Sequence, residues 1–354
     1  MPEKKVFTVV QADGLYPDET VENAILRANL PESYEVNYKQ LDLFPTGVPD
    51  AKPWSDIPAD LREKIDGIMV LKLPFTAEDL ALFPRLKVIV RMGVGYDRLD
   101  RVALDKRGVT VCNVPDYGTS EIADHALALA LALRRGVLLH HDQQREPYLA
   151  PYAVAESPLI ARLNNATFGI LGLGRIGTAA ALRAKAFGWK VIFYDPYVPS
   201  GFDKTINVER VKDIKELFRR STTLSIHCAC TGETRDMIGW DLLSLMPRGS
   251  VLVNTGRGEV MKLDAVERAL KEGILSGAGL DVLPDEPLPK DNVHPLIQAY
   301  RKNESWLTGR LVLTCHTAFY APESFEEIRT KSVETMRDVL IDGGKQNVIP
   351  VDAW

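Results

Sequence analysis

Three short segments carry side chains that could bind a carboxylic acid and exchange a proton with its hydroxyl group. Arg257 stands between two glycines, Glu286 follows the acid Asp281 by five residues, and His316 stands near the end of the chain. A guanidinium can bind a carboxylate through two parallel hydrogen bonds. An imidazole can give or take a hydroxyl proton, and a carboxylate bonded to its second nitrogen fixes the tautomer. Each residue type is common on protein surfaces by itself, so the interest lies in their joint placement.

All three segments directly follow short apolar runs that we predict to be strands, at 251–254, 277–281 and 311–313. Helical patterns separate these runs, which is typical of a parallel, doubly wound sheet. The carboxyl ends of parallel strands share one edge of a sheet, and ligands bind there. We therefore expect the arginine, the acids and the histidine to lie along one edge.

The segment 167–177 predicts what binds beside them. It reads as a buried strand, a glycine turn and the start of a helix, and Gly172, Gly174 and Gly177 fit the pattern G-x-G-x-x-G. A second predicted strand ends in Asp195, at the distance where a dinucleotide site places its ribose-binding acid. An ordinary strand-to-helix turn with an incidental acid is the alternative interpretation. With the three segments above, the pattern predicts hydride transfer between a nicotinamide cofactor and a hydroxy acid.

Composition sets broad limits. The 354 residues suffice for two domains, and a net charge of −5 gives no reason to expect a nucleic-acid partner. We find no secretory signal pattern and no apolar run long enough to span a membrane. The four cysteines suggest free thiols in a reducing compartment, so a cytoplasmic protein is expected. His227 and Cys228 with Cys230 offer too few ligands for a metal site, and none is predicted.

Strands and helices alternate along the whole chain, which predicts two α/β domains with doubly wound parallel sheets. We expect a substrate domain of residues 1–117 plus 320–354 and a cofactor domain of residues 118–319. A long helix is predicted over 121–141 and another over 321–341, whereas 285–309 reads as a long polar loop.

These motifs, in this order, resemble the NAD-dependent D-isomer-specific 2-hydroxyacid dehydrogenases. The resemblance covers nearly the whole chain and is weakest over the first 60 residues and over 290–309. The segments 181–188 and 193–197 are most similar to the branch of C-terminal-binding proteins, which are transcriptional corepressors with a dehydrogenase fold. The resemblance implies a flavodoxin-like substrate domain with an inserted NAD-binding Rossmann domain, and a homodimer.

The resemblance also implies roles for residues at matching positions. Arg257 would bind the substrate, His316 would be the general acid and base, and Glu286 would be the partner of His316. The residues that would contact NAD are Gly172, Gly174, Arg175, Ile176, Gly177, Asp195, His227, Cys228, Thr234, Thr255, Gly256 and Asp281. The residues that would contact the 2-oxo or 2-hydroxy acid are Arg91, Val94, Gly95 and Phe319.

The chain departs from the family pattern at three places. Cys315 stands where the family commonly has proline, Phe319 stands where the corepressor branch has tryptophan, and 293–308 looks like an insertion. The leading hypothesis is an enzyme that reversibly reduces a 2-oxo acid. The alternative is an NAD(H)-sensing corepressor or scaffold with weak activity, for which a nuclear location would also fit; it needs a peptide-binding groove that this sequence does not reveal.

Overall fold

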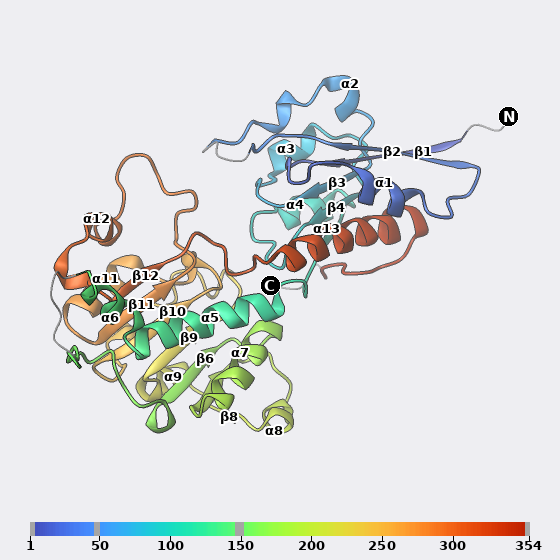
Figure 1. Cartoon of the computed structure of the whole chain (residues 1–354). Helices are drawn as coiled ribbons and strands as arrows, with labels where there is room; N and C mark the ends of the chain where they lie inside the picture. Colours follow the sequence, from blue (N-terminus) through green and yellow to red (C-terminus); the bar gives the residue numbers. More distant parts are fainter. Residues whose placement is uncertain (1–3, 46–49, 146–151, 351–354) are drawn as a thin grey trace. The chain divides into compact units, whose positions relative to one another are not determined.

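The computed structural model describes residues 4–45, 50–145 and 152–350, which form two compact units (Figure 1). Unit 1 consists of Met1–Tyr117 and Ala321–Trp354, and unit 2 is Gly118–Tyr320. The chain therefore crosses between the units twice, after Tyr117 and after Tyr320.

Unit 1 contains a five-stranded sheet in the order β2-β1-β3-β4-β5, and all neighbouring strands are parallel. Its strands are β1 (Lys5–Gln11), β2 (Tyr34–Gln40), β3 (Gly67–Val70), β4 (Val88–Arg91) and β5 (Thr110–Asn113). Its helices are α1 (Thr20–Arg27), η1 (Trp54–Asp56), α2 (Ala59–Arg62), α3 (Ala77–Ala81), α4 (Arg101–Lys106), α13 (Pro322–Arg337) and the π-helical turn η5 (Asp338–Asp342). This strand order is that of flavodoxin-like sheets.

Helices cover both faces of the unit 1 sheet. Successive side chains of each strand point to opposite faces, so the strands offer apolar side chains to helices on either side. Ile68 of β3 packs in an apolar cluster with Leu80 of α3 and Leu104 of α4. Gly67 faces the other way, and a Cβ atom there would lie 2.6 Å from the sulfur of Met336 on α13. Helix α13 also packs on α1, so the C-terminal helix completes the fold of the N-terminal unit (Figure 1).

Unit 2 contains a seven-stranded parallel sheet in the order β12-β11-β10-β9-β6-β7-β8. Its strands are β6 (Thr167–Leu171), β7 (Lys190–Tyr194), β8 (Glu209–Arg210), β9 (Thr223–Ile226), β10 (Ser250–Asn254), β11 (Leu275–Leu280) and β12 (Leu311–Leu313). Its helices are α5 (Thr119–Arg134), α6 (Val137–Gln143), η2 (Leu163–Asn165), α7 (Arg175–Ala186), α8 (Phe202–Ile206), α9 (Ile214–Arg220), α10 (Trp240–Leu243), η3 (Gly258–Val260), α11 (Leu263–Lys271), α12 (Pro295–Arg301) and η4 (Ser305–Leu307). The order reverses between β6 and β9, which is the topological switch point of a Rossmann sheet.

Two apolar clusters fill the two faces of this sheet. Phe168 and Ile170 of β6 pack with α5 and α7 on one face. Leu171, the next residue of the same strand, packs with α9, α11 and α12 on the other face. The expected pair of doubly wound α/β sheets is confirmed.

Two expected elements are wrong in part. The helix predicted over 121–141 breaks at Gly136, which takes the left-handed conformation (φ 60°) and separates α5 from α6. The stretch 285–309 is not one loop, because it contains α12 and η4. Helix α12 begins at Pro295 with the ring of His294 accepting a hydrogen bond from the backbone N–H of Leu296 at 3.1 Å.

A buried arginine anchors the end of α5. Arg134 is 2% exposed and donates hydrogen bonds to the hydroxyl of Thr223 and to the backbone carbonyls of Leu159, Thr222 and Gly249. Burial lowers the pKa of Arg134 to about 10. The guanidinium thereby ties α5 to the amino ends of β9 and β10, opposite to the edge described next.

Candidate active site

The glycine turn after β6 has the backbone that a bound pyrophosphate requires. Gly172 has φ 90°, and a Cβ atom there would lie 2.7 Å from the backbone nitrogen of Cys228. A Cβ atom on Gly177 would collide with the carbonyl oxygen of Gly172, whereas one on Gly174 would have no neighbour within 4 Å in the described chain. Gly174 is the N-cap of α7, so it borders the open end of a helix where N–H groups favour an anion. Arg175 and Ile176 begin that helix.

Further residues along the same edge fit a dinucleotide. Asp195 follows β7, and its two oxygens accept the backbone N–H groups of Leu173 (2.7 Å) and Tyr197 (2.9 Å). The carboxylate keeps acceptor capacity for two ribose hydroxyls. After β9 and β10, respectively, His227 Nδ1 and Thr255 Oγ1 are buried without a hydrogen-bond partner among the described residues. Orphaned polar atoms of this kind are costly in a folded protein unless a ligand satisfies them.

The loop after β10 presents Arg257. The buried amide of Asn254 shapes this loop, because its Oδ1 accepts from the N–H of Gly256 (3.0 Å) and its Nδ2 donates to the carbonyl of Arg257 (2.9 Å). Gly258 approaches the backbone of Leu283 so closely that any Cβ atom would clash. The Arg257 loop therefore packs directly on the loop that carries Glu286.

Glu286 and His316 form a short polar contact at this edge. Nδ1 of His316 lies 2.5 Å from Oε2 of Glu286, while Oε1 of Glu286 accepts the N–H of Leu283 at 2.9 Å. Among the residues that the structure describes, none hydrogen-bonds to Nε2 of His316. An imidazole whose Nδ1–H is held by a carboxylate can give and take a proton at Nε2.

The backbone of His316 is unusual, and Asp281 holds the residues around it. His316 has φ 49°, a left-handed conformation that few residues other than glycine adopt. Its N–H donates to the carbonyl of Asp281 at 2.7 Å. The carboxylate of Asp281 is 1% exposed and accepts the N–H groups of Thr317 (2.9 Å) and Ala318 (3.0 Å). Asp281 thus holds the segment that follows β12, and its expected contact with the nicotinamide stays a prediction.

The strand order sets the sequence of these residues along the edge. The strands from β12 to β7 are followed in turn by His316, by Asp281 with Glu286, by Arg257 with Thr255 and Gly256, by His227 with Cys228, by the glycine turn, and by Asp195. This arrangement places His316 and Glu286 near one end of the edge and Asp195 at the other. Burial lowers the pKa of His227 to about 4 and raises the pKa of Cys228 to about 12, so both groups are neutral at pH 7.

Two other expected residues of unit 2 lie beside this edge. The hydroxyl of Thr234 donates to the carbonyl of Ala229 at 2.6 Å and closes the turn after β9. Phe319 lies against Gly118 at the start of the unit. The cofactor role of Thr234 and the substrate role of Phe319 remain predictions.

The expected substrate residues of unit 1 follow β4. Arg91 ends that strand, and its Nη1 donates to the carbonyl of Met92 at 3.0 Å. Its guanidinium lies against Gly93, where a side chain would collide with it. Val94 and Gly95 follow, and the side chain of Asn113 donates to the carbonyl of Val94 at 2.7 Å. The carboxyl edge of the unit 1 sheet therefore carries a firmly held turn.

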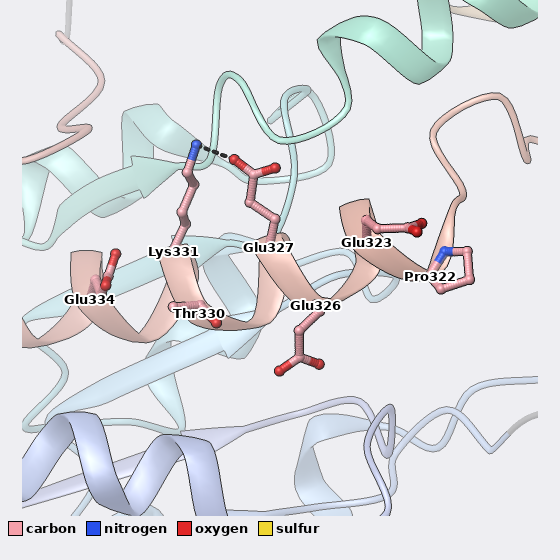
Figure 2. A pocket seen from close by; sticks show the side chains of 7 residues that line it. All are labelled: Pro322, Glu323, Glu326, Glu327, Thr330, Lys331 and Glu334. Atoms are coloured by element: carbon pink, nitrogen blue, oxygen red, sulfur yellow. Dashed lines mark ion pairs between the residues drawn. The ribbon is translucent and has the colours of Figure 1, made fainter.

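The hollow along α13 contains none of the expected site residues (Figure 2). It is lined by Pro322, Glu323, Glu326, Glu327, Thr330, Lys331 and Glu334. Lys331 pairs with Glu327 at 2.5 Å and with Asp116 at 2.7 Å. A surface with this excess of carboxylates repels an anionic oxo acid, so it does not suit the substrate.

One cluster in unit 2 has metal-binding side chains, namely Asp264, Glu267 and His294. Its chemistry argues against a metal ion. Nδ1 of His294 accepts a backbone N–H, so its Nε2 carries the proton and faces Asp264 at 2.8 Å. A metal at Nε2 would move that proton to Nδ1 and break the helix cap, and Glu267 is already paired with Lys271 at 2.6 Å.

Sequence reasoning missed three polar residues that build this edge. Asn254 shapes the Arg257 loop, as described above. Thr314 and His125 contact the His316 segment, although His125 lies far away in the sequence. Only Asn254 left a signal, because an asparagine two residues before a glycine at the end of a strand is typical of a turn closed by a side-chain bond.

Comparisons with known proteins agree with this geometry. A profile described as "D-isomer specific 2-hydroxyacid dehydrogenase, NAD binding domain" matches residues 127–318. The glyoxylate reductase of Korarchaeum cryptofilum (strain OPF8) is 36% identical over 277 residues, which are 77% of this chain and 78% of that protein.

Two further similar proteins are a C-terminal-binding protein and a D-lactate dehydrogenase. C-terminal-binding protein 1 of Caenorhabditis elegans is 32% identical over 283 residues, which are 79% of this chain but only 38% of that protein. The crystal structure of D-lactate dehydrogenase from Aquifex aeolicus, complexed with NAD and lactic acid, superposes with a TM-score of 0.73 at 26% identity, over 95% of this chain and 98% of that one.

Proposed function

Because the chain belongs to the D-isomer-specific 2-hydroxyacid dehydrogenase family, we propose that it reversibly reduces a 2-oxo acid to a D-2-hydroxy acid. It is an NAD-dependent oxidoreductase by that membership. The observation that carries the proposal is the 2.5 Å contact between His316 Nδ1 and Glu286 Oε2, beside the loop of Arg257. An arginine can bind the carboxylate of the substrate, and an imidazole paired with a carboxylate can exchange the proton of its hydroxyl group.

In this proposal each residue has one task. Arg257 binds the substrate through its carboxylate and carbonyl oxygen, which also stabilises the negative charge that develops on that oxygen. His316 gives the proton from Nε2 to the oxygen in reduction and takes it back in oxidation. Glu286 accepts the hydrogen bond from Nδ1–H and thereby fixes the tautomer and orientation of the imidazole. When bound, NADH supplies the hydride; the residues at Gly172–Gly177, Asp195, His227 and Thr255 would hold it.

The identity of the 2-oxo acid is a separate proposal. The name of the K. cryptofilum relative makes glyoxylate the first substrate to test. Arg91, Val94, Gly95 and Phe319 are proposed to contact the substrate. We also propose that the protein is cytoplasmic and that it forms a homodimer. Light scattering after size-exclusion chromatography would check the homodimer.

The experiment is a screen of NADH oxidation with glyoxylate, pyruvate, hydroxypyruvate and bulky or aromatic 2-oxo acids. Arg257→Gln and His316→Asn should each lower kcat/KM by about 10³-fold or more while NADH binding, followed by fluorescence, changes little. Asparagine is chosen because it tolerates the left-handed backbone at that position. Arg248→Gln is the matched control, since Arg248 is bonded to the carbonyl of Glu272 in the same unit. Full activity of either variant would refute the assignment.

A second candidate function comes from the similarity to the C. elegans protein. An NAD(H)-sensing corepressor or scaffold would bind NADH yet turn over every 2-oxo acid in the panel poorly. The same screen therefore separates the two candidates.

A further inference from the structure

We infer that Thr314 and His125 are positioning residues for His316, an inference that rests on the proposed role of His316 as proton donor. His316 lies in a short segment between β12 and the end of unit 2, and its backbone is left-handed. Such a segment needs support from outside itself to keep one conformation. Hydrogen bonds from neighbouring elements give that support.

The support runs from α5 through Thr314 to Asp281. The hydroxyl of Thr314 donates to Oδ1 of Asp281 at 2.5 Å, and Nε2 of His125 lies 3.0 Å from the same hydroxyl oxygen. A threonine hydroxyl has only one hydrogen, and Asp281 receives it. Nε2 of His125 therefore carries the proton of the second contact and donates to Thr314. His125 Nε2 also lies 3.8 Å from Asp281 Oδ1.

Asp281 connects Thr314 to the backbone around His316 through hydrogen bonds. Its side chain accepts from residues 314, 317 and 318, and its backbone carbonyl accepts the N–H of His316. Every one of these bonds fixes the segment on either side of the imidazole. Without the hydroxyl of Thr314, Oδ1 of Asp281 loses a donor and Nε2–H of His125 is left without its acceptor.

Helix α5 gives His125 a rigid base. The helix has 16 residues and buries Ala126 and Leu129 against the unit 2 sheet, where the Cβ atom of Leu129 would lie only 3.0 Å from a Cβ atom on Gly279 of β11. A donor on this helix is therefore fixed relative to β11, which Asp281 follows. A displacement of about 1 Å at a proton donor can cost about 100-fold in rate, so small losses in this network should be measurable.

The test compares Thr314→Val, which keeps the shape and removes the hydroxyl, with Thr314→Ser, which keeps the hydroxyl. Thr314→Val should lower kcat for the best 2-oxo acid about tenfold or more, with KM and NADH affinity within about twofold of the parent. Thr314→Ser should stay within about threefold. Thr222→Val is the control, because its hydroxyl bonds to the carbonyl of Thr167 at the opposite edge of the same sheet.

His125 is tested in the same way. His125→Leu should lower kcat as Thr314→Val does, His125→Gln should recover part of it through its amide donor, and the double variant should be no worse than Thr314→Val alone. In the cofactor-free protein, the downfield proton signal of His316 Nδ1–H, assigned by its loss in His316→Asn, should persist in Thr314→Ser and weaken in Thr314→Val.

The inference is overturned if Thr314→Val keeps the parent kcat, if Thr314→Ser falls equally far, or if the losses of the two single variants multiply. Inactivity of the parent protein towards every 2-oxo acid is a different result, which overturns the proposed function and this inference with it. An unchanged Nδ1–H signal in Thr314→Val counts against the positioning role whatever the activity.

Discussion

The glycines after β6 differ in what surrounds them, although the pattern G-x-G-x-x-G does not distinguish between them. Gly177 is enclosed by the carbonyl of Gly172, whereas Gly174 faces space that no described atom fills. Gly177 is therefore needed by the fold, whereas we propose that Gly174 is needed for the approach of the ligand. The same distinction separates structural from binding glycines in any turn of this kind.

Substitution by alanine should separate these two requirements. Gly177→Ala should lower the free energy of unfolding by about 2–3 kcal/mol because the methyl group meets backbone. Gly174→Ala should fold as the parent does and weaken NADH binding about 100-fold, because the methyl group occupies the approach of the pyrophosphate. Urea unfolding and fluorescence titration measure the two effects. Equal loss of stability in both variants would contradict this distinction.

At the scale of elements, hydrogen bonds hold α5 at both the amino edge and the carboxyl edge of the sheet. Its last turn is tied to the amino edge by Arg134, and its second turn contacts the carboxyl edge through His125. Sequence periodicity predicted a buried helix here because its alanines and leucines are close together. It could not predict either polar tie, since both depend on partners about 90 to 190 residues away.

The tie at Arg134 makes a prediction on stability. Arg134→Met removes the donor of four hydrogen bonds and leaves buried carbonyl groups unsatisfied, so the free energy of unfolding should fall by about 3 kcal/mol. The neighbouring Arg135 is exposed, and Arg135→Met should change stability by less than about 0.5 kcal/mol. Urea unfolding of both variants checks this; a small effect at Arg134 would mean that water replaces its bonds.

At the scale of the whole molecule, the sequence predicted the sheet class and the strand ends that carry the candidate site residues. Apolar runs followed by glycine, acid or histidine are local patterns, and parallel topology brings them to one edge. The helix α12 was missed because proline and charged residues dilute its short pattern. The break at Gly136 was missed because one glycine within a helical run is often tolerated.

The burial of His227 predicts how stability depends on pH. Its Nδ1 is shielded and its Nε2 lies 2.8 Å from the hydroxyl of Ser225, and burial lowers its pKa to about 4. Between pH 6.5 and 4 the unfolded chain binds a proton that the native protein does not. The free energy of unfolding should therefore fall with falling pH through that range, by up to about 1.4 kcal/mol per unit, and this contribution should be constant above it.

His227→Gln should remove this part of the pH dependence, while the exposed His141→Gln should leave it in place. Urea unfolding at pH 7.5 and pH 5.5 measures the difference. The burial argument fails if His227→Gln shows the same pH dependence as the parent.

The left-handed backbone of His316 also limits how this site could be redesigned. At φ 49° only glycine, asparagine and aspartate replace histidine at low cost, and none of them offers an imidazole. Saturation mutagenesis at this position should thus return well-folded but inactive proteins for those three and less stable proteins for most others. Engineers who want a different proton donor would have to bring it in from a neighbouring strand end.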